Sequence, residues 1–285
     1  MSISLKRSME VGNNLLVVDG MNLAFRWKHQ GATDFAEDYI RTIDSLKRSY
    51  KAKWVVVLTD HGGSVYRRSV YSEYKQNRKD KHATQTPEEA AAFEQFLVDY
   101  AMCLTELRIQ DKYIVLQYKG VEADDMSALI SHLVTTGKLP AVEHVWNISS
   151  DADWDLLCSE QVSRFSYVSR KEFTIDNWST HYECTPEEFI SIKCLMGDAG
   201  DNVPGVPKVG PKRALELVRT YGGALDVAAS LPIASNLQYI KNLNEFGSEQ
   251  ILTNYQLMDL VTFCQEAIGD DNVAEITSIL TSYIK

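Results

Sequence analysis

Nine acidic residues, in five groups, stand where the chain passes from one secondary-structure element to the next. The groups are Asp19; Asp60; Glu122, Asp124 and Asp125; Asp151 and Asp153; and Asp198 and Asp201. A single Asp after a strand is most often a turn residue or a helix N-cap, and acids at a helix start are favoured by the helix dipole alone. The case for chemistry therefore depends on these groups meeting in the fold.

If the groups meet, their charges need compensation. Two carboxylates about 4 Å apart repel each other by about 4 kcal/mol at an effective dielectric constant near 20. Carboxylate oxygens suit Mg²⁺ or Mn²⁺, and a set of this size indicates two ions, which can flank a phosphate and stabilise both its attacking and its leaving oxygen. The composition agrees, because 39 acidic against 29 basic residues give a net charge of −10, and these nine acids account for most of the difference.

Two basic segments could hold phosphates. The first combines cations with tyrosines, which is the combination that grips a single strand; it contains Arg67, Arg68, Lys75, Arg78, Lys79 and Lys81, interleaved with Tyr66, Tyr71 and Tyr74. A solvated basic loop is the alternative interpretation of this segment. The second cluster surrounds a glycine-rich turn, whose amides and following helix could bind a phosphate backbone without reading bases; its members are Lys208, Lys212, Arg213 and Arg219.

The elements that must position the acids form an alternating pattern. Short apolar runs at 15–18, 54–58 and 145–148 lead into Asp19, Asp60 and Asp151, and a fourth run at 113–118 precedes Gly120. Such runs are typical of strands buried on both faces of a parallel sheet. Helical patterns lie between them, one of them opened by a capping box at Thr86 and Glu89. The sequence therefore predicts an α/β fold with a mostly parallel central sheet and helices on both faces, with the acids at the carboxyl ends of the strands.

The pattern changes near residue 185. Thr185 and Glu188 form a second capping box, a turn follows at 205–212, and the rest reads as helical. We expect an α/β core over residues 1–184, with an arch region at about 64–107, and a helical region over 185–285. The stretch 62–85 has little apolar pattern and is expected to be a loop or a poorly packed excursion.

Composition excludes several classes of protein. The longest apolar runs are far shorter than the roughly 20 residues of a membrane span, and the N-terminus lacks an apolar run suited to a secretory signal. Five cysteines without a C-x-x-C pair argue against a disulfide framework or a thiolate zinc site. We expect a cytoplasmic protein without membrane contact.

In this order and spacing, the motifs resemble those of the 5′ nucleases, the family of phage flap endonucleases and 5′–3′ exonucleases that also forms the N-terminal domain of bacterial DNA polymerase I. The resemblance covers most of the chain and is closest to the compact phage type. It is carried by VDGMN around Asp19, by Asp60, SEYKQNR (72–78), GVEADD (120–125) and SDADWD (150–155), and by the long GDAGDNVPGVPKVGPKRA stretch (197–214).

The resemblance implies an α/β nuclease core, a helical arch and a helix–three-turn–helix clamp for duplex DNA. It implies two Mg²⁺ ions, with Mn²⁺ as a substitute, held by all nine acids. The earlier members would lie nearer one ion and the Asp198 and Asp201 pair nearer the other, with Asp125 and Asp151 between them. Lys75 and Arg78 match arch residues that contact the scissile phosphate, and Tyr74 matches one that stacks on a base. The remaining DNA contacts implied are Lys193, Lys208, Lys212, Arg213 and Arg26.

One position departs from the family pattern. The family hairpin usually reads glycine–hydrophobic–glycine, but Lys208 stands where the first glycine is expected. A lysine resists positive φ, so the hairpin and the K⁺ ion that the family often holds there, near 206–209, are less strongly implied than the metal site.

The implied activity is hydrolysis of DNA phosphodiesters at 5′ ends, flaps or branches, with RNA-primed strands as a further substrate. It would yield 5′-phosphate and 3′-hydroxyl ends in replication, repair and the removal of Okazaki-fragment primers. We expect a monomer, which would act in the host cytoplasm if a phage encodes it. Two alternatives are a PIN-like ribonuclease, against which the hairpin and basic arch count, and a DNA-binding protein that has lost catalysis, although every expected acid is present.

Overall fold

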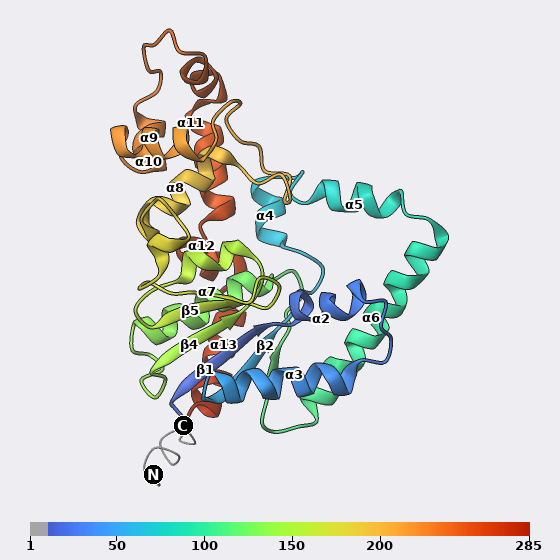
Figure 1. Cartoon of the computed structure of the whole chain (residues 1–285). Coiled ribbons are helices and arrows are strands. Elements are labelled where there is room, and N and C mark those ends of the chain that lie inside the picture. Colours follow the sequence, from blue (N-terminus) through green and yellow to red (C-terminus); the bar gives the residue numbers. More distant parts are fainter. Residues whose placement is uncertain (1–10) are drawn as a thin grey trace. The chain divides into compact units, whose positions relative to one another are not determined.

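The computed structural model describes residues 11–285, and the prediction about a secretory signal falls partly on residues 1–10, outside that range. The chain forms two compact units (Figure 1). The first contains Met1–Gly63, Thr86–Ile175 and Cys264–Lys285, and the second contains Ser64–Gln85 and Asp176–Phe263. The expected boundary at residues 184 and 185 stays a prediction.

The first unit is built on a six-stranded sheet with the order β3-β2-β1-β4-β5-β6. Every neighbouring pair is parallel except β5 and β6, which are antiparallel. The strands are β1 (Asn14–Asp19), β2 (Ala52–Leu58), β3 (Ile114–Leu116), β4 (His144–Ile148), β5 (Val162–Ser166) and β6 (Lys171–Phe173). The mostly parallel sheet predicted from the apolar runs is confirmed.

Strand β1 is buried on both faces, as its continuous apolar run predicts. Leu16 and Val18 pack in a core cluster with Ile43 and Leu107. The alternating residues Leu15 and Val17 are also fully buried and point to the other face, because side chains alternate along a strand. Both faces of the sheet must therefore be covered by helices.

Helices α2 (Gly20–His29), α3 (Ala36–Ser49) and α6 (Pro87–Arg108) pack together on one face. Helix α7 (Ala123–Thr135) contacts β1, β2 and β4 from the other face, and α13 (Asp270–Tyr283) is linked to β2 by a hydrogen bond from the Val55 N–H to the Tyr283 hydroxyl. The short 3₁₀ helix η1 (Ala152–Leu157) follows β4. The capping box predicted at Thr86 and Glu89 is present at the start of α6.

The second unit is helical. Its elements are α4 (Val65–Val70), α5 (Gln76–Ala83), η2 (Trp178–Thr180), α8 (Pro186–Met196), α9 (Pro211–Tyr221), α10 (Ala224–Ala229), α11 (Gln238–Met258) and the start of α12 (Leu260–Ile268). The predicted capping box at Thr185 opens α8, and Pro211 is the first residue of α9. Leu195, Leu217 and Leu243 lie in the core that joins α8, α9 and α11.

The expectation of a loop over residues 62–85 is wrong, because α4 and α5 form there. Helix α4 begins where the Ser64 hydroxyl accepts a hydrogen bond from the Arg67 N–H, and the buried Arg67 guanidinium donates to the Leu257 carbonyl at 2.8 Å. Helix α5 has no buried residue but is tied at its start to the turn at 198–203, where the Lys75 N–H donates to the Asp201 carbonyl. Contacts with distant residues, rather than an apolar pattern, hold this segment.

No helix in the described part of the chain is long and apolar enough to cross a membrane.

Candidate active site

Asp19 ends β1 and caps α2, so its carboxylate lies at the carboxyl edge of the sheet. One oxygen accepts from the Asn22 N–H at 3.1 Å, and the other accepts from the Ser149 hydroxyl at 2.8 Å. Ser149 follows β4, the neighbour of β1, and its hydroxyl also accepts from the Asp151 N–H. One buried serine therefore links the acids at the ends of two adjacent strands.

The surroundings of Asp19 disfavour the ionised form of its carboxylate. Burial raises its pKa to about 7, with further increases from the charges of Asp60 and, less strongly, Asp151. These three carboxylates are thus near enough to interact, and they follow the adjacent strands β1, β2 and β4. A cation at this edge would offset the electrostatic cost of keeping Asp19 ionised.

Helix α7 brings the next group of acids to the same edge. The Asp60 carboxylate accepts from the Ala123 N–H at 2.7 Å, which joins the end of β2 to the start of α7. Glu122 stands at the N-cap of α7, and Asp124 and Asp125 lie in its first turn, where the helix dipole favours negative charge. Glu122 and Asp125 are buried.

The turn of η1 supplies Asp151 and Asp153. Asp151 is the N-cap, and its carboxylate accepts from the Asp153 N–H at 2.9 Å. Trp154, which is fully buried, donates its indole N–H to the Asp124 carboxylate at 2.6 Å and so joins η1 to α7. Seven of the nine predicted acids therefore belong to the carboxyl-edge elements of the first unit.

A buried ion pair between Arg164 and Asp155 holds η1 against β5. Arg164 of β5 binds both carboxylate oxygens of Asp155 and donates to the Ser149 carbonyl at 3.0 Å. Both side chains are almost completely buried. Ser149, Trp154 and Arg164 were not among the residues predicted for the site. The SDADWD stretch contains Trp154 and adjoins Ser149, whereas no local signal marks Arg164.

The donor set fits hard divalent cations, although within residues 11–285 no three His, Cys, Asp or Glu side chains are arranged to enclose one ion. Mg²⁺ is usually bound by one or two carboxylates and keeps several waters, so it needs no closed protein cage. Oxygen donors alone, with one acid whose pKa is raised by burial and like charge, match that chemistry.

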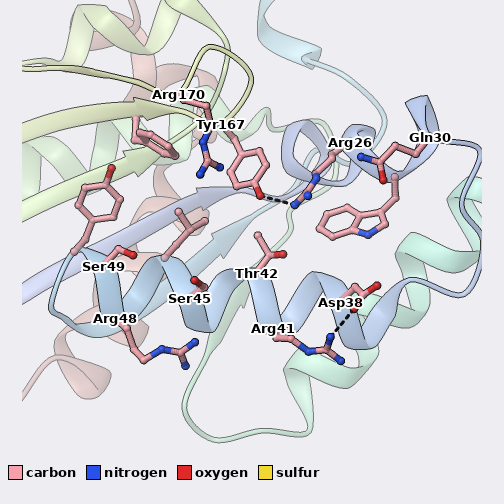
Figure 2. Close-up of a pocket in the computed structure, with 14 residues that line it drawn as sticks. Arg26, Gln30, Asp38, Arg41, Thr42, Ser45, Arg48, Ser49, Tyr167 and Arg170 are labelled. Carbon is pink, nitrogen blue, oxygen red and sulfur yellow. Dashed lines mark hydrogen bonds and ion pairs between the residues drawn. The ribbon is translucent and has the colours of Figure 1, made fainter.

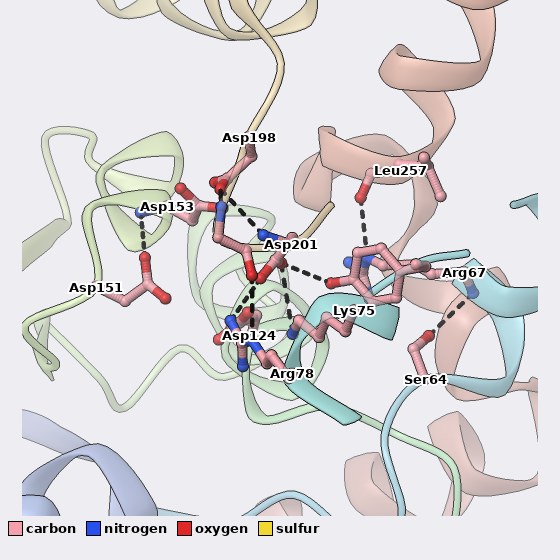
Figure 3. A network of polar contacts seen from close by, with 12 residues as sticks. Ser64, Arg67, Lys75, Arg78, Asp124, Asp151, Asp153, Asp198, Asp201 and Leu257 are labelled. Carbon is pink, nitrogen blue, oxygen red and sulfur yellow. Dashed lines mark hydrogen bonds and ion pairs between the residues drawn. The ribbon is translucent and has the colours of Figure 1, made fainter. Parts of the chain in front are cut away.

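The other two predicted acids lie in the second unit. The Asp201 carboxylate accepts from the Tyr74 hydroxyl at 2.9 Å and pairs with Lys75 at 3.5 Å and with Arg78 (Figure 3). Burial alone would raise the pKa of Asp201, but the positive charges of Lys75 and Arg78 outweigh it and hold the pKa below its usual value. The two predicted catalytic cations are thus gathered around one predicted metal ligand.

Asp198 organises the turn that carries Asp201. Its carboxylate accepts from the N–H groups of Gly200 and Asp201 at 2.7 and 3.2 Å. The Lys193 ammonium, predicted to contact duplex DNA, lies 4.0 Å from the Asp198 carboxylate.

The stacking role predicted for Tyr74 stays a prediction. Without DNA its side chain is only 5% exposed and packs against Val203, Leu257 and Met258. Its hydroxyl donates to the Asp201 carboxylate, so Tyr74 also positions that acid.

Lys208 takes the backbone conformation that its predicted hairpin requires. Its φ is 66°, in the left-handed region that favours glycine. The Arg213 guanidinium donates to the Lys208 carbonyl at 2.6 Å, and the Asn242 amide donates to the Pro207 carbonyl at 2.7 Å. Lys212 and Arg213 are exposed in the first turn of α9, where N–H groups are unpaired by the helix. Arg26 lies in the last turn of α2, in the first unit, and is exposed.

Two family models match nearly the whole chain. The 5′–3′ exonuclease N-terminal resolvase-like domain matches residues 14–183, and the 5′–3′ exonuclease C-terminal SAM fold matches residues 184–276. The flap endonuclease of Escherichia phage T5 is 44% identical over 259 residues, which cover 90% of this chain and 86% of that protein.

More distant relatives and solved structures agree with this match. DNA polymerase I of Bacillus subtilis is 27% identical over 263 residues, covering 87% of this chain and 28% of the polymerase. A crystal structure of the phage T5 D15 flap endonuclease, a pseudo-enzyme-product complex with DNA and metal ions, has a TM-score of 0.88 and 39% identity, covering 95% of this chain and 99% of that one. With two family models spanning residues 14–276 and a relative 44% identical over most of both chains, this protein belongs to the 5′–3′ exonuclease family.

Proposed function

We propose that this chain is a divalent-metal-dependent, structure-specific 5′ nuclease that cuts DNA at 5′ ends, flaps and branches, leaving 5′-phosphate and 3′-hydroxyl ends. Its class, a flap endonuclease and 5′–3′ exonuclease that hydrolyses DNA, follows from its family and from its likeness to the phage T5 enzyme. The observation that carries the finer proposal is the group of acids at the carboxyl edge of the sheet, where Asp19 interacts with Asp60 and Asp151.

The proposed cofactors are two Mg²⁺ ions, with Mn²⁺ able to replace them. The residues that would hold them are Asp19, Asp60, Glu122, Asp124, Asp125, Asp151, Asp153, Asp198 and Asp201. When bound, such ions supply an acidified water and charge compensation for the phosphodiester. The chain's own residues hold the carboxylates in place: Ser149 orients Asp19, and Trp154 orients Asp124.

Lys75 and Arg78 are proposed to bind the scissile phosphate, where their charge would offset the anion that develops in the transition state. Without substrate, both cations pair with Asp201, so a phosphate must compete with that carboxylate for them. Tyr74, by holding Asp201, would keep this competition in a fixed geometry.

Lys193, Lys208, Lys212, Arg213 and Arg26 are proposed to contact the DNA backbone. A K⁺ ion is proposed at the hairpin of 206–209, although the Pro207 and Lys208 carbonyls there already accept from Asn242 and Arg213. We further propose that the enzyme acts as a monomer in the cytoplasm and removes RNA-primed 5′ ends during replication and repair.

A cleavage assay on a 5′-flap DNA labelled at its 5′ end tests the proposed function. We expect cuts near the flap junction with Mg²⁺ or Mn²⁺ and none with EDTA, and weak or absent cutting of single-stranded RNA of the same sequence. Undiminished cleavage in EDTA, or a preference for the RNA, would contradict the proposal.

A further inference from the structure

A pocket of about 580 Å³ opens on the first unit, and none of the nine predicted acids lines it (Figure 2). Its walls come from α2, from α3 and from the segment that follows β5. Pockets of 300–1,000 Å³ are the usual size for small-molecule sites, so this one is far larger than a single bare anion requires. All of its lining residues belong to the first unit.

The lining of this pocket is strongly basic. It contains four arginines (Arg26, Arg41, Arg48 and Arg170) and one acid, Asp38. Arg41 is neutralised by Asp38 and by Glu37, both on its own helix. Within residues 11–285, none of the other three arginines forms an ion pair with a carboxylate. Nearby acids still act on this charge: Arg48 interacts with Asp44, and the Glu172 carboxylate accepts from the Tyr50 hydroxyl at the pocket wall. The lining itself carries more positive than negative charge, four arginines against Asp38.

Two of these arginines are held by the same aromatic ring. The guanidinium carbons of Arg26 and Arg170 lie 4.8 and 4.9 Å from the centre of the Tyr167 ring. The Arg26 guanidinium also donates a hydrogen bond to the Tyr167 hydroxyl. A cation–π contact orients a guanidinium without neutralising its charge, so both groups remain able to bind an anion.

Neutral groups complete the pocket. Thr42 and Ser45 place hydroxyls on the side of α3 that lines it (Figure 2), and the partly exposed Tyr50 and Tyr167 supply aromatic surface. Guanidinium forks and hydroxyls suit phosphate oxygens, and aromatic rings suit a flat base.

We propose that this pocket binds a nucleotide through its phosphate, with Arg26 and Arg170 as the principal ligands. The phosphate belongs either to a free nucleoside 5′-monophosphate or to one unit of a DNA strand. The proposal gives the enzyme a phosphate site outside the carboxylates, and it does not depend on the assignment of the metal ligands.

Calorimetric titration of the full chain with dTMP in EDTA tests this proposal in the absence of cleavage. We expect saturable binding of dTMP and none of thymidine, which lacks the phosphate. Arg170→Gln should weaken dTMP binding at least tenfold, which is about 1.4 kcal/mol, because it removes a charged hydrogen-bonding partner of the phosphate. The affinity of Arg170→Lys for dTMP should fall between those of the parent protein and Arg170→Gln, because lysine keeps the charge but loses the planar fork.

The matched control is Arg108→Gln, which removes an exposed arginine of the same unit that bonds Gln117 outside the pocket. Fluorescence anisotropy of a labelled hexathymidylate, also in EDTA, distinguishes the two sources of phosphate. A loss of hexamer affinity in Arg170→Gln, with or without a loss for dTMP, assigns the site to a strand, whereas a loss for dTMP with unchanged hexamer affinity assigns it to a free nucleotide. If Arg170→Gln binds both probes as tightly as Arg108→Gln does, the proposed nucleotide site is overturned. If instead Arg170→Gln loses affinity as expected but the parent protein does not cleave the flap, only the proposed function is overturned.

Discussion

At the scale of single residues, Asp201 has two roles: it forms ion pairs within the protein, and it is a proposed metal ligand. In the structure its carboxylate neutralises Lys75 and Arg78 and accepts from Tyr74. The proposed chemistry requires the same carboxylate to help hold a divalent ion. Removing it should therefore affect catalysis far more than folding, because the two cations that pair with it are 15% and 54% exposed and can be solvated, which leaves only the buried Tyr74 hydroxyl without its acceptor.

Asp201→Ala should lower flap cleavage by about a hundredfold or more, the size of effect seen when one preorganised electrostatic group is removed. Affinity for the flap measured in Ca²⁺ or EDTA should stay within a few-fold, and circular dichroism should be unchanged. Asp80→Ala removes another acid of the second unit, whose carboxylate accepts from the Gln76 side-chain amide, and should cleave normally. Loss of the folded state in Asp201→Ala would mean that the acid is structural.

Trp154→Phe removes the indole N–H that orients Asp124. We expect the affinity for Mn²⁺ to fall about tenfold, since groups that orient metal ligands are typically worth 10–100-fold in affinity. Trp178→Phe is the control: that indole is also buried, but it donates to the Cys184 carbonyl in the other unit. Equal Mn²⁺ affinities in the two variants would show that Trp154 does not position the site.

At this scale the sequence predicts the acids but not the residues that orient them by hydrogen bonds. Each of the acids stands at a local signal, which is a strand end, a helix start or, for Asp198 and Asp201, a glycine-containing turn, and a short window of sequence contains that signal. Trp154 and Asp124 are 30 positions apart, and Ser149 and Asp19 are 130 apart, so their hydrogen bonds are created only by the fold. The burial of Tyr74 was not predicted for the same reason: it depends on Leu257 and Met258, which are distant in sequence.

At the scale of elements, the hairpin before α9 depends on an unusual residue. Lys208 adopts φ 66°, where a non-glycine residue is strained by roughly 1–2 kcal/mol. The turn is formed nonetheless, with its carbonyl held by Arg213. The lysine therefore adds a positive charge to the proposed DNA surface at a cost in stability.

Lys208→Gly should be more stable than Lys208→Ala, with a free energy of unfolding about 0.5–1 kcal/mol higher in urea denaturation. The reason is that alanine keeps the strain at positive φ and glycine does not. Both variants remove one charge, so both should weaken duplex binding equally and flatten its salt dependence by about one unit of slope. The account of this hairpin would fail if the alanine variant were as stable as the glycine variant.

The second element-scale feature is the buried pair that holds η1 against β5. Arg164→Met should destabilise the protein by about 3–5 kcal/mol, because Asp155 would be left buried and unpaired. The double variant Arg164→Met with Asp155→Leu should recover much of that loss, since a buried ion pair is often replaced by apolar groups at little cost. Urea denaturation measures both; a single variant as stable as the parent would contradict the pairing.

Elements with local signals were predictable, and elements held by distant partners were not. The capping boxes at Thr86 and Thr185 lie within four residues each, and both are present. Strand β5 was missed because its sequence, VSRFS, carries an arginine that is buried only through Asp155. Helix α4 was missed because Arg67 is anchored to Leu257, 190 positions away.

At the scale of the whole molecule, the net charge of −10 looks unsuited to a DNA-binding enzyme. The charges are segregated, however: acids gather at the carboxyl edge of the sheet, and basic residues gather in α5, at the start of α9 and around the Tyr167 pocket. Bound divalent ions would neutralise part of the acidic group. The account therefore requires the acids of both units to contribute to cation binding.

Calorimetric titration of the metal-free protein with Mn²⁺ tests that requirement most directly, without reference to cleavage. The account predicts saturable binding of two ions per chain, with one of them weakened in Asp201→Ala from the second unit and at least one lost in Asp124→Asn from the first. No saturable binding in the parent protein, or identical titrations of the parent and both variants, would contradict it.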